Sequence, residues 1–260
     1  MTKFLTALGA PAIAFILEAG SLLLLFFSAL RNIFNRRMLI RTCKQMYIIG
    51  AKSMFLIALI GIFTGMVLGL QGYYALVKFG SEGLLGALVA LSLVRELGPV
   101  LAAIMIAGRA GSAMAAEIGV MRITDQIDAL DVMDINSVSY LISPRLLASI
   151  LVFPLLTAIF DVIGIIGGYL TGVVMLGINS GVYLYRMESN IDMVDISGGF
   201  IKSLVFAALV SIVCCYMGYF CHLRRDGVGP EAVSNAITSA VVMSCVLILC
   251  SDYIMTSLLM

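Results

Sequence analysis

The sequence is poor in charged residues. Only 12% of its 260 residues are charged, whereas 62% are hydrophobic and the mean hydropathy is +1.10. In ordinary soluble domains about a quarter of the residues are charged. This shortage excludes a soluble protein, and no polar stretch is long enough to form a separate soluble domain. We therefore expect residues 1–260 to form one all-α integral membrane domain.

Motifs for chemistry are also scarce. The chain has a single histidine and no recognisable nucleophile constellation, and its six cysteines lack the spacing of a metal site. No Gly-x-x-x-x-Gly-Lys-Ser/Thr phosphate loop occurs, because Lys52 follows Ala51 and Lys202 follows Ile201. We expect no enzyme activity, metal or cofactor in this chain. Any ATP-driven work must come from a partner.

Several apolar runs are long enough to cross a bilayer, which takes roughly 20 residues. Five such runs cover residues 53–77, 83–107, 146–176, 200–221 and 233–258. A sixth run, residues 10–30, carries Glu18 midway, and a carboxylate at the bilayer centre costs about 2.5–3.5 kcal/mol. The sequence thus favours five transmembrane helices and an N-terminal interfacial helix. The alternative that residues 10–30 also span stays open.

The basic residues are distributed unevenly over the two sides of these spans. Twelve of the 16 Lys and Arg residues fall on the side that holds the segment before the first span. Because Lys and Arg concentrate in cytoplasmic loops, this side is predicted to be cytoplasmic. The N-terminus is then cytoplasmic, whereas residues 177–199 and the C-terminus face outward.

Two charges interrupt the second apolar run. In the stretch LVRELGP, Arg95 and Glu96 are adjacent, and neighbouring residues on a helix do not face each other. Each therefore needs its own partner, and pairing of Arg95 or Lys202 with Asp252 is one possibility. The charges either fix helix packing, or Arg95 and Lys202 face a cavity that receives an anionic group. Pro99 removes a helical hydrogen bond and is expected to widen the space beside Arg95.

Small and apolar residues form three further patterns. Glycines at a spacing of four occur in the first and third spans, where they predict close helix packing: Gly61, Gly65, Gly69 and Gly164, Gly168, Gly172. Leu68, Gly72, Ala75 and Phe79 share a narrow arc of the first span. This arc is typical of helix packing or lipid contact. If it faces the same cavity as Arg95, the cavity suits an amphiphile.

The segment 112–136 joins the second and third spans and is too polar to cross. Apolar residues follow the i, i+4, i+7 pattern at Ile123, Ile127 and Leu130, and acidic residues recur at Asp125, Asp128 and Asp131. An acidic face is a poor match to an anionic inner leaflet. Docking of a cytoplasmic partner is therefore favoured over a helix that lies on the membrane.

Three stretches together resemble one protein family: GMVLGLQGY (65–73), ALSLVRELGPVLAAIMIAGRAGSAMAAEIGVMR (90–122) and SPRLLASILVFPLL (143–156). They are similar to the MlaE family of ABC-transporter permeases, which move lipids across or out of the bacterial inner membrane. The resemblance covers roughly residues 40–257. It implies a homodimer, a cytoplasmic ABC ATPase dimer that binds ATP and Mg, and a periplasmic MCE-domain hexamer. A small cytoplasmic accessory subunit is possible, and no nucleic acid is expected.

The same resemblance implies residue roles. The lipid-binding positions would be Arg95, Glu96, Lys202, Leu68, Ala75, Leu76 and Phe79. The resemblance places Glu117 and Gly119 at the start of the coupling segment, and together with the charge pattern of that segment the expected ATPase-coupling positions are Glu117, Gly119, Arg122, Asp125, Asp128 and Asp131. The expected function is phospholipid transport between the inner and outer membranes. The alternatives are an ion- or proton-coupled carrier that uses Glu96, Asp161 and Asp252, and a scaffold that transports nothing. Asp161 matches no family feature.

Overall fold

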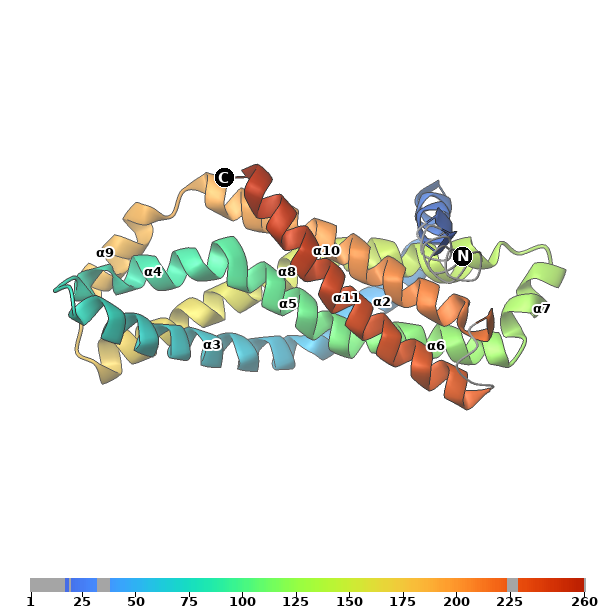
Figure 1. Ribbon diagram of the computed structural model, residues 1–260, viewed down its shortest axis with the longest axis horizontal. Helices are drawn as coiled ribbons and strands as arrows, with labels where there is room; N and C mark the ends of the chain where they lie inside the picture. Colours follow the sequence, from blue (N-terminus) through green and yellow to red (C-terminus); the bar gives the residue numbers. More distant parts are fainter. Residues whose placement is uncertain (1–16, 19, 32–37, 224–228, 260) are drawn as a thin grey trace, which may run out of the picture.

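A bundle of long helices makes up the molecule (Figure 1). The computed structural model describes residues 17–18, 20–31, 38–223 and 229–259, and these residues contain no strand. Five of the described helices are long and apolar enough to cross a membrane: Leu39–Val77, Glu82–Ile123, Ser137–Met175, Met193–Tyr219 and Pro230–Leu259. The prediction of an all-α, multi-pass membrane protein with five transmembrane helices is confirmed.

The long helices contain several shorter elements. The first comprises α2 (Met38–Met46), a π-helical turn (Tyr47–Ala51) and α3 (Lys52–Val77). The second comprises a 3-10 turn (Glu82–Leu84), α4 (Leu85–Ser92), a π-helical turn (Leu93–Leu97), α5 (Gly98–Ile106), a π-helical turn (Ala107–Gly111) and α6 (Ser112–Ile123). The remainder are α7 (Gln126–Val132), α8 (Ser137–Tyr169) with a π-helical turn (Leu170–Met175), α9 (Ser180–Asn190), α10 (Met193–Tyr219), a 3-10 turn (Cys221–Leu223) and α11 (Pro230–Leu259).

The helices extend well beyond the apolar runs. The second contains 42 residues, which at 1.5 Å per residue is about 60 Å, twice the roughly 30 Å thickness of the hydrocarbon core. Figure 1 places α9 at one end of the long axis and α7 at the other. The predicted outer loop 177–199 is also largely helical, because it contains α9 and the first turns of α10.

The segment 112–136 does not form one amphipathic helix. Its first part is α6, which continues the second long helix without a break as far as Ile123. Asp125 then adopts the left-handed conformation, with φ of 57°, and only the short helix α7 follows. The expected i, i+4, i+7 face through Ile123 and Leu130 is therefore interrupted, because a left-handed residue ends a helix.

A glycine seam joins α3 to α8. A Cβ atom added at Gly65 would overlap the carbonyl oxygen of Gly164, and one added at Gly69 would lie 3.2 Å from the carbonyl oxygen of Gly168. Small residues let two backbones approach this closely, so dispersion contacts rather than hydrophobic burial hold the pair in lipid. The α3 glycines therefore face the backbone of α8, whereas a Cβ at Gly164 or Gly168 would meet Leu93 or Val89 of the second long helix.

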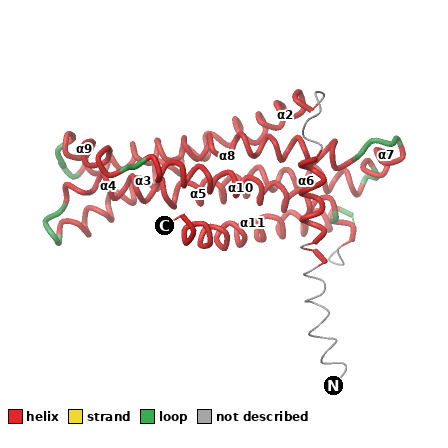
Figure 2. The backbone as a smooth tube through the Cα atoms, turned by 90° about the horizontal axis from the view of Figure 1, so that it is seen from above, coloured by secondary structure: helices red, strands yellow, loops and turns green. Residues whose placement is uncertain are grey.

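The N-terminal helix, Gly20–Arg31, lies across the long axis of the bundle (Figure 1). It is held by hydrogen bonds from Ser143 Oγ to the carbonyl oxygen of Ala29, 2.9 Å, and between Ser21 Oγ and the Tyr216 hydroxyl, 2.8 Å. This orientation agrees with an interfacial helix rather than a sixth span. The prediction for residues 10–16 and 19 lies outside the described residues; Figure 2 draws this part of the chain in grey.

We predict that Gly65→Ala destabilises the protein, because its Cβ would meet backbone rather than a movable side chain. Overpacking typically costs about 1–3 kcal/mol. Gly108→Ala is the matched control, because nothing lies within 4 Å of a Cβ at that position. Thermal unfolding of both variants in detergent measures the difference. Equal melting temperatures would contradict the seam.

Candidate functional site

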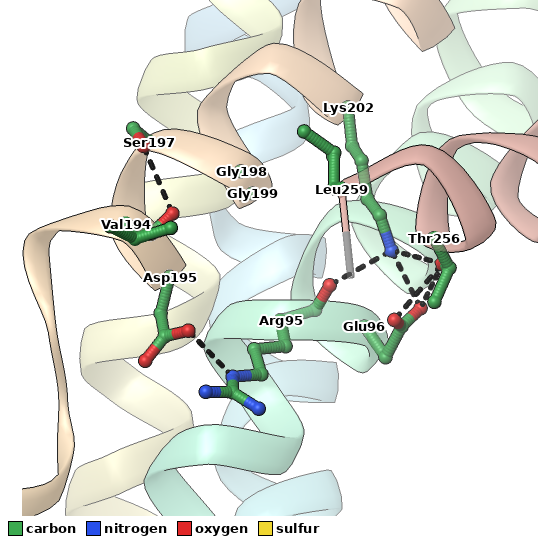
Figure 3. A pocket seen from close by; sticks show the side chains of 10 residues that line it. All are labelled: Arg95, Glu96, Val194, Asp195, Ser197, Gly198, Gly199, Lys202, Thr256 and Leu259. Atoms are coloured by element: carbon green, nitrogen blue, oxygen red, sulfur yellow. Dashed lines mark hydrogen bonds and ion pairs between the residues drawn. The ribbon is translucent and has the colours of Figure 1, made fainter.

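The site begins at a π-helical turn in the second long helix. The turn covers Leu93–Leu97, and Pro99 follows in the first turn of α5. Proline has no N–H group, so Pro99 cannot donate to the carbonyl oxygen of Arg95 four residues earlier. That oxygen instead accepts a hydrogen bond from Lys202 Nζ of α10 at 3.1 Å (Figure 3). The carbonyl oxygen that Pro99 leaves unpaired in the second span is thus paired with the Lys202 ammonium group of α10.

Lys202 is the centre of a buried polar cluster. Its ammonium group lies 2.7 Å from Glu96 Oε2, 3.0 Å from Asp252 Oδ1 and 2.7 Å from Thr256 Oγ1. Thr256 in turn donates to Glu96 Oε1 at 3.0 Å. Only 3% of the Lys202 side chain is exposed. A buried charge is stable only when it is paired and hydrogen-bonded. Glu96 and Thr256 are hydrogen-bonded to the ammonium group, whereas Asp252 Oδ1 forms an ion pair with it but no hydrogen bond among the described residues.

Arg95 has a different partner. Its Nε donates to Asp195 Oδ1 of α10 at 2.7 Å, and 41% of its side chain is exposed. Asp195 Oδ2 also accepts from the backbone N–H of Asp192 at 3.2 Å, which caps the start of α10. Within the described chain, the terminal nitrogens of Arg95 make no hydrogen bond and point away from Asp195 (Figure 3).

The predicted pairing of Lys202 with Asp252 is confirmed, and the prediction that Arg95 and Glu96 use separate partners is confirmed as well. The partner of Arg95 was missed, because Asp195 lies in the segment that was expected to be a loop. Its spacing of three from Asp192, just before an apolar run, is the signal of a helix N-terminus that could have revealed it. Thr256 follows Asp252 by four residues and therefore lies on the same face of α11.

A pocket of about 340 Å³ opens beside these charges. It is lined by Arg95, Glu96, Val194, Asp195, Ser197, Gly198, Gly199, Lys202, Thr256 and Leu259 (Figure 3). The predicted apolar stripe does not line it. Leu68 and Leu76 pack against the core, whereas Ala75 is exposed and Phe79 is 81% exposed. Within one chain, the predicted apolar lipid-binding residues therefore lie outside the pocket that the predicted charged residues line.

The predicted coupling residues lie at the end of the molecule that carries α7. Arg122 contacts residues on two other segments. Its NH1 atom donates to Asp128 Oδ1 of α7 at 2.7 Å, and its Nε atom donates to His222 Nδ1 at 3.0 Å. Asp125 and Asp131 are exposed. Arg122 thereby connects α7 to the segment that follows α10.

Two of the coupling positions are less accessible to a partner. Gly119 is buried, and a Cβ there would lie 3.1 Å from Val233 of α11. Glu117 is half-exposed and accepts from Arg145 NH2 at 2.7 Å. Both belong to α6, which extends the second span, and α11 packs closely on α6 at Gly119.

His222 has an unusual environment for the only histidine of the chain. Partial burial and the neighbouring Arg122 guanidinium lower the pKa of His222 below its usual range. At neutral pH the ring is therefore uncharged and can accept the hydrogen bond from Arg122. Protonation of His222 would therefore disrupt its hydrogen bond from Arg122, which connects α7 to the turn after α10.

Residues 42–258 match the family described as Permease MlaE. The chain belongs to the MlaE permease family. It is 40% identical to the intermembrane phospholipid transport system permease protein MlaE of Haemophilus influenzae over 261 residues, covering 100% of this chain and 98% of the relative.

Other relatives of this MlaE-family permease come from different organisms. A probable ABC transporter permease protein of Rickettsia bellii is 45% identical over 215 residues, which cover 83% of this chain and 81% of the relative. The chloroplastic protein TRIGALACTOSYLDIACYLGLYCEROL 1 of Arabidopsis thaliana is 35% identical over 216 residues, covering 83% of this chain and 60% of the relative. The resemblance to MlaE permeases inferred from the sequence is confirmed.

Asp161 of this MlaE-family permease lies apart from the Lys202 cluster. It sits on α8 against the kinked second span, where a Cβ at Gly98 would overlap its Oδ1 atom. Among the described residues, Oδ1 of Asp161 has no hydrogen-bond partner. Its position explains why residue 98 is glycine, because the carboxylate occupies the space that any side chain would need.

We predict that Lys202→Met strongly destabilises the permease, because it leaves the partly buried Glu96 and Asp252 carboxylates without a cation. Removal of one partner from a buried pair costs about 3–5 kcal/mol. The triple variant Lys202→Met, Glu96→Gln, Asp252→Asn is expected to regain part of this loss, and Lys78→Met is the exposed control. Thermal unfolding in detergent reports each value. A single variant as stable as the parent would refute the cluster's structural role.

Proposed function

We propose that this chain is the permease subunit of an ABC transporter in the bacterial inner membrane. It moves phospholipid between the inner and outer membranes. Family membership supports the transporter class, and the name of the Haemophilus influenzae relative supports the substrate. The observation that carries the proposal is the pocket at Arg95, where charged side chains lie within a membrane-spanning segment and border an open space. Intramembrane charges of this kind mark substrate pathways.

In this proposal Arg95 contacts the lipid phosphate. Its terminal nitrogens are free for a ligand among the described residues, and a guanidinium matches phosphate oxygens in geometry and charge. Lys202 has another task. Because Glu96, Asp252 and Thr256 already surround its ammonium group, Lys202 holds the bulged turn in place and leaves Arg95 directed into the pocket.

A homodimer supplies the apolar part of the binding site. The first and last long helices are the least covered, with 28% of their most apolar windows buried, compared with 50–61% in the other three. Phe79 and Ala75 lie on the exposed surface of this region, outside the charged pocket. A second copy packed on these helices would complete one cavity, with Arg95 at the headgroup and the Leu68 to Phe79 face at an acyl chain.

The energy comes from a separate cytoplasmic ATPase dimer that docks at α7. The exposed acidic residues Asp125, Asp128 and Asp131 are available to that partner, and a small accessory subunit can bind beside it. At the opposite end, α9 faces a periplasmic MCE-domain hexamer that receives the lipid. This orientation places the N-terminus in the cytoplasm and the C-terminus in the periplasm, as the basic residues predict.

The coupling route follows α10. Movement of α7 reaches the end of α10 through Arg122 and His222, and the same helix carries Asp195 and Lys202 near its other end. A rigid displacement of α10 therefore changes the surroundings of Arg95. ATP binding thus opens or closes the pocket without any nucleotide site in this chain.

A second candidate function, an ion- or proton-coupled carrier, is favoured by the buried and unpaired Asp161. Intramembrane carboxylates often form proton relays. Such a carrier predicts lipid transport without an ATPase and loss of transport when an uncoupler collapses the proton gradient. The ABC permease predicts instead that lipid transport requires the ATPase and continues when an uncoupler collapses the proton gradient.

We predict that Arg95→Gln lowers phospholipid occupancy and transport about 10- to 100-fold, since a hydrogen bond to a charged group contributes roughly 1.5–3 kcal/mol. Mass spectrometry of lipids that copurify with the protein measures occupancy, and ATP-dependent lipid transfer from reconstituted vesicles measures transport. Lys78→Gln, an exposed cation outside the pocket, is the control. Unchanged occupancy and transport in Arg95→Gln would rule out the proposed headgroup contact.

A further inference from the structure

A second cavity lies far from Arg95, between α2, α6 and α8. It has a volume of about 740 Å³. Its polar walls are formed by Arg41, Lys44, Gln45, Glu117, Gln126, Tyr140 and Arg145. Three cations and one carboxylate line this space, so the cavity carries a formal excess of two positive charges. The pocket at Arg95 has no such excess, because its two cations face three carboxylates.

The cations are held in place by the walls. Arg41 and Lys44 lie on one face of α2 because they are three residues apart, and the Arg41 guanidinium stacks 3.5 Å from the centre of the Tyr140 ring. Arg145 is 5% exposed. It donates from NH1 to the carbonyl oxygen of Leu141 at 2.6 Å and from NH2 to Glu117 at 2.7 Å. Arg41 and Lys44 are exposed, so the buried Arg145 and the stacking of Arg41 on Tyr140 are what make this cavity a built site.

Two buried polar atoms in this cavity have no partner among the described residues. They are Nε of Arg145, a donor, and Oε1 of Gln45, an acceptor. Buried polar groups are almost always hydrogen-bonded, so each unpaired group needs an explanation. A ligand with acceptor oxygens for Arg145 and a donor group for Gln45 satisfies both. A phosphate that carries a hydroxylated or protonated headgroup has this combination.

The depth of the cavity is fixed by the N-terminal helix. Ser143 of α8, two residues from Arg145, donates to Ala29 of that helix, which lies across the bundle as interfacial helices do (Figure 1). The helix exposes Leu23, Leu24 and Phe27, which require contact with lipid. The cavity therefore lies at the level of the membrane surface, on the side rich in Lys and Arg.

The outer face of α2 supports the same placement. Leu39 and Ile40 are among its most exposed residues, and they lie beside the face that carries Arg41 and Lys44. A helix with lipid-exposed leucine and isoleucine next to cavity-facing cations separates acyl chains from headgroups. In contrast, α7 lies farther along the long axis, beyond the N-terminal helix (Figure 1). Gln126, the first residue of α7, also lines the cavity, so the test below separates a lipid from a protein partner docked at α7.

We propose that this cavity binds the phosphate headgroup of an anionic lipid from the cytoplasmic leaflet. The phosphate lies between Arg41, Lys44 and Arg145, and the rest of the headgroup reaches Gln45. The bound lipid connects α2 to α6 and α8 at the base of the coupling end. This site is separate from the pocket at Arg95, and its existence does not depend on the transported substrate.

The test measures binding of dioleoyl phosphatidylglycerol to the full-length protein in detergent by native mass spectrometry. Dioleoyl phosphatidylcholine and inorganic phosphate are the comparison ligands. Arg41→Gln with Lys44→Gln is expected to weaken phosphatidylglycerol binding about 25-fold, because each cation near an anionic lipid contributes about fivefold. Lys52→Gln, an exposed cation that does not line the cavity, is expected to bind like the parent. Arg95→Gln is expected to leave this binding event intact.

Three outcomes would overturn the proposal. Equal phosphatidylglycerol affinity in the double variant and the Lys52→Gln control would mean that no headgroup binds there. Binding of inorganic phosphate with the same dependence on Arg41 and Lys44 would assign the site to a soluble anion. If lipid affinity is unchanged but a coexpressed ATPase no longer copurifies, the site belongs to a protein partner. Lys44→Gln alone, expected to lose about fivefold, replaces the double variant if that variant does not fold.

Discussion

The contact between Lys202 and the carbonyl oxygen of Arg95 is the interaction on which the rest of the site depends. Pro99 makes this oxygen available, and the π-helical turn turns Arg95 and Glu96 toward α10 and α11. An unpaired carbonyl in hydrocarbon costs several kcal/mol, so the lysine stabilises a backbone defect as well as the Glu96 and Asp252 carboxylates. The guanidinium of Arg95 is held by Asp195 and lines the open pocket.

The long helices connect the pocket at Arg95 to the end of the molecule that carries α7. The glycine seam between α3 and α8 holds the scaffold at the closest approach that two backbones allow. Because the second long helix, Glu82–Ile123, and α10 run from the pocket region to the coupling end, a partner that moves α7 acts on rigid elements rather than on loops. The pocket at Arg95 and the cationic cavity beside α2 lie at different levels of one bundle, and each has charged residues suited to its own ligand.

Part of the site could be predicted from single residues. Arg95 and Glu96 were recognisable because charges within an apolar run require partners, and Asp252 was a candidate partner of Lys202 for the same reason. Asp195 was not recognised, because it lies where the apolar run had not yet begun. The end of α6 was also missed, since nothing in the residues before Asp125 distinguishes a continued span from a separate amphipathic helix.

The sequence by itself determined the membrane class, the five spans, the glycine packing faces and the family. These features follow from hydropathy, from a period of four residues and from a long specific motif, all of which are local properties of the chain. The tertiary structure alone decided which carboxylate meets which cation, that Leu68 and Phe79 lie outside the charged pocket of one chain, and that a second cationic cavity exists. The ion pairs of Arg95 and Lys202 join residues about 50 to 106 positions apart. Their geometry is set by helix packing, which no local pattern specifies.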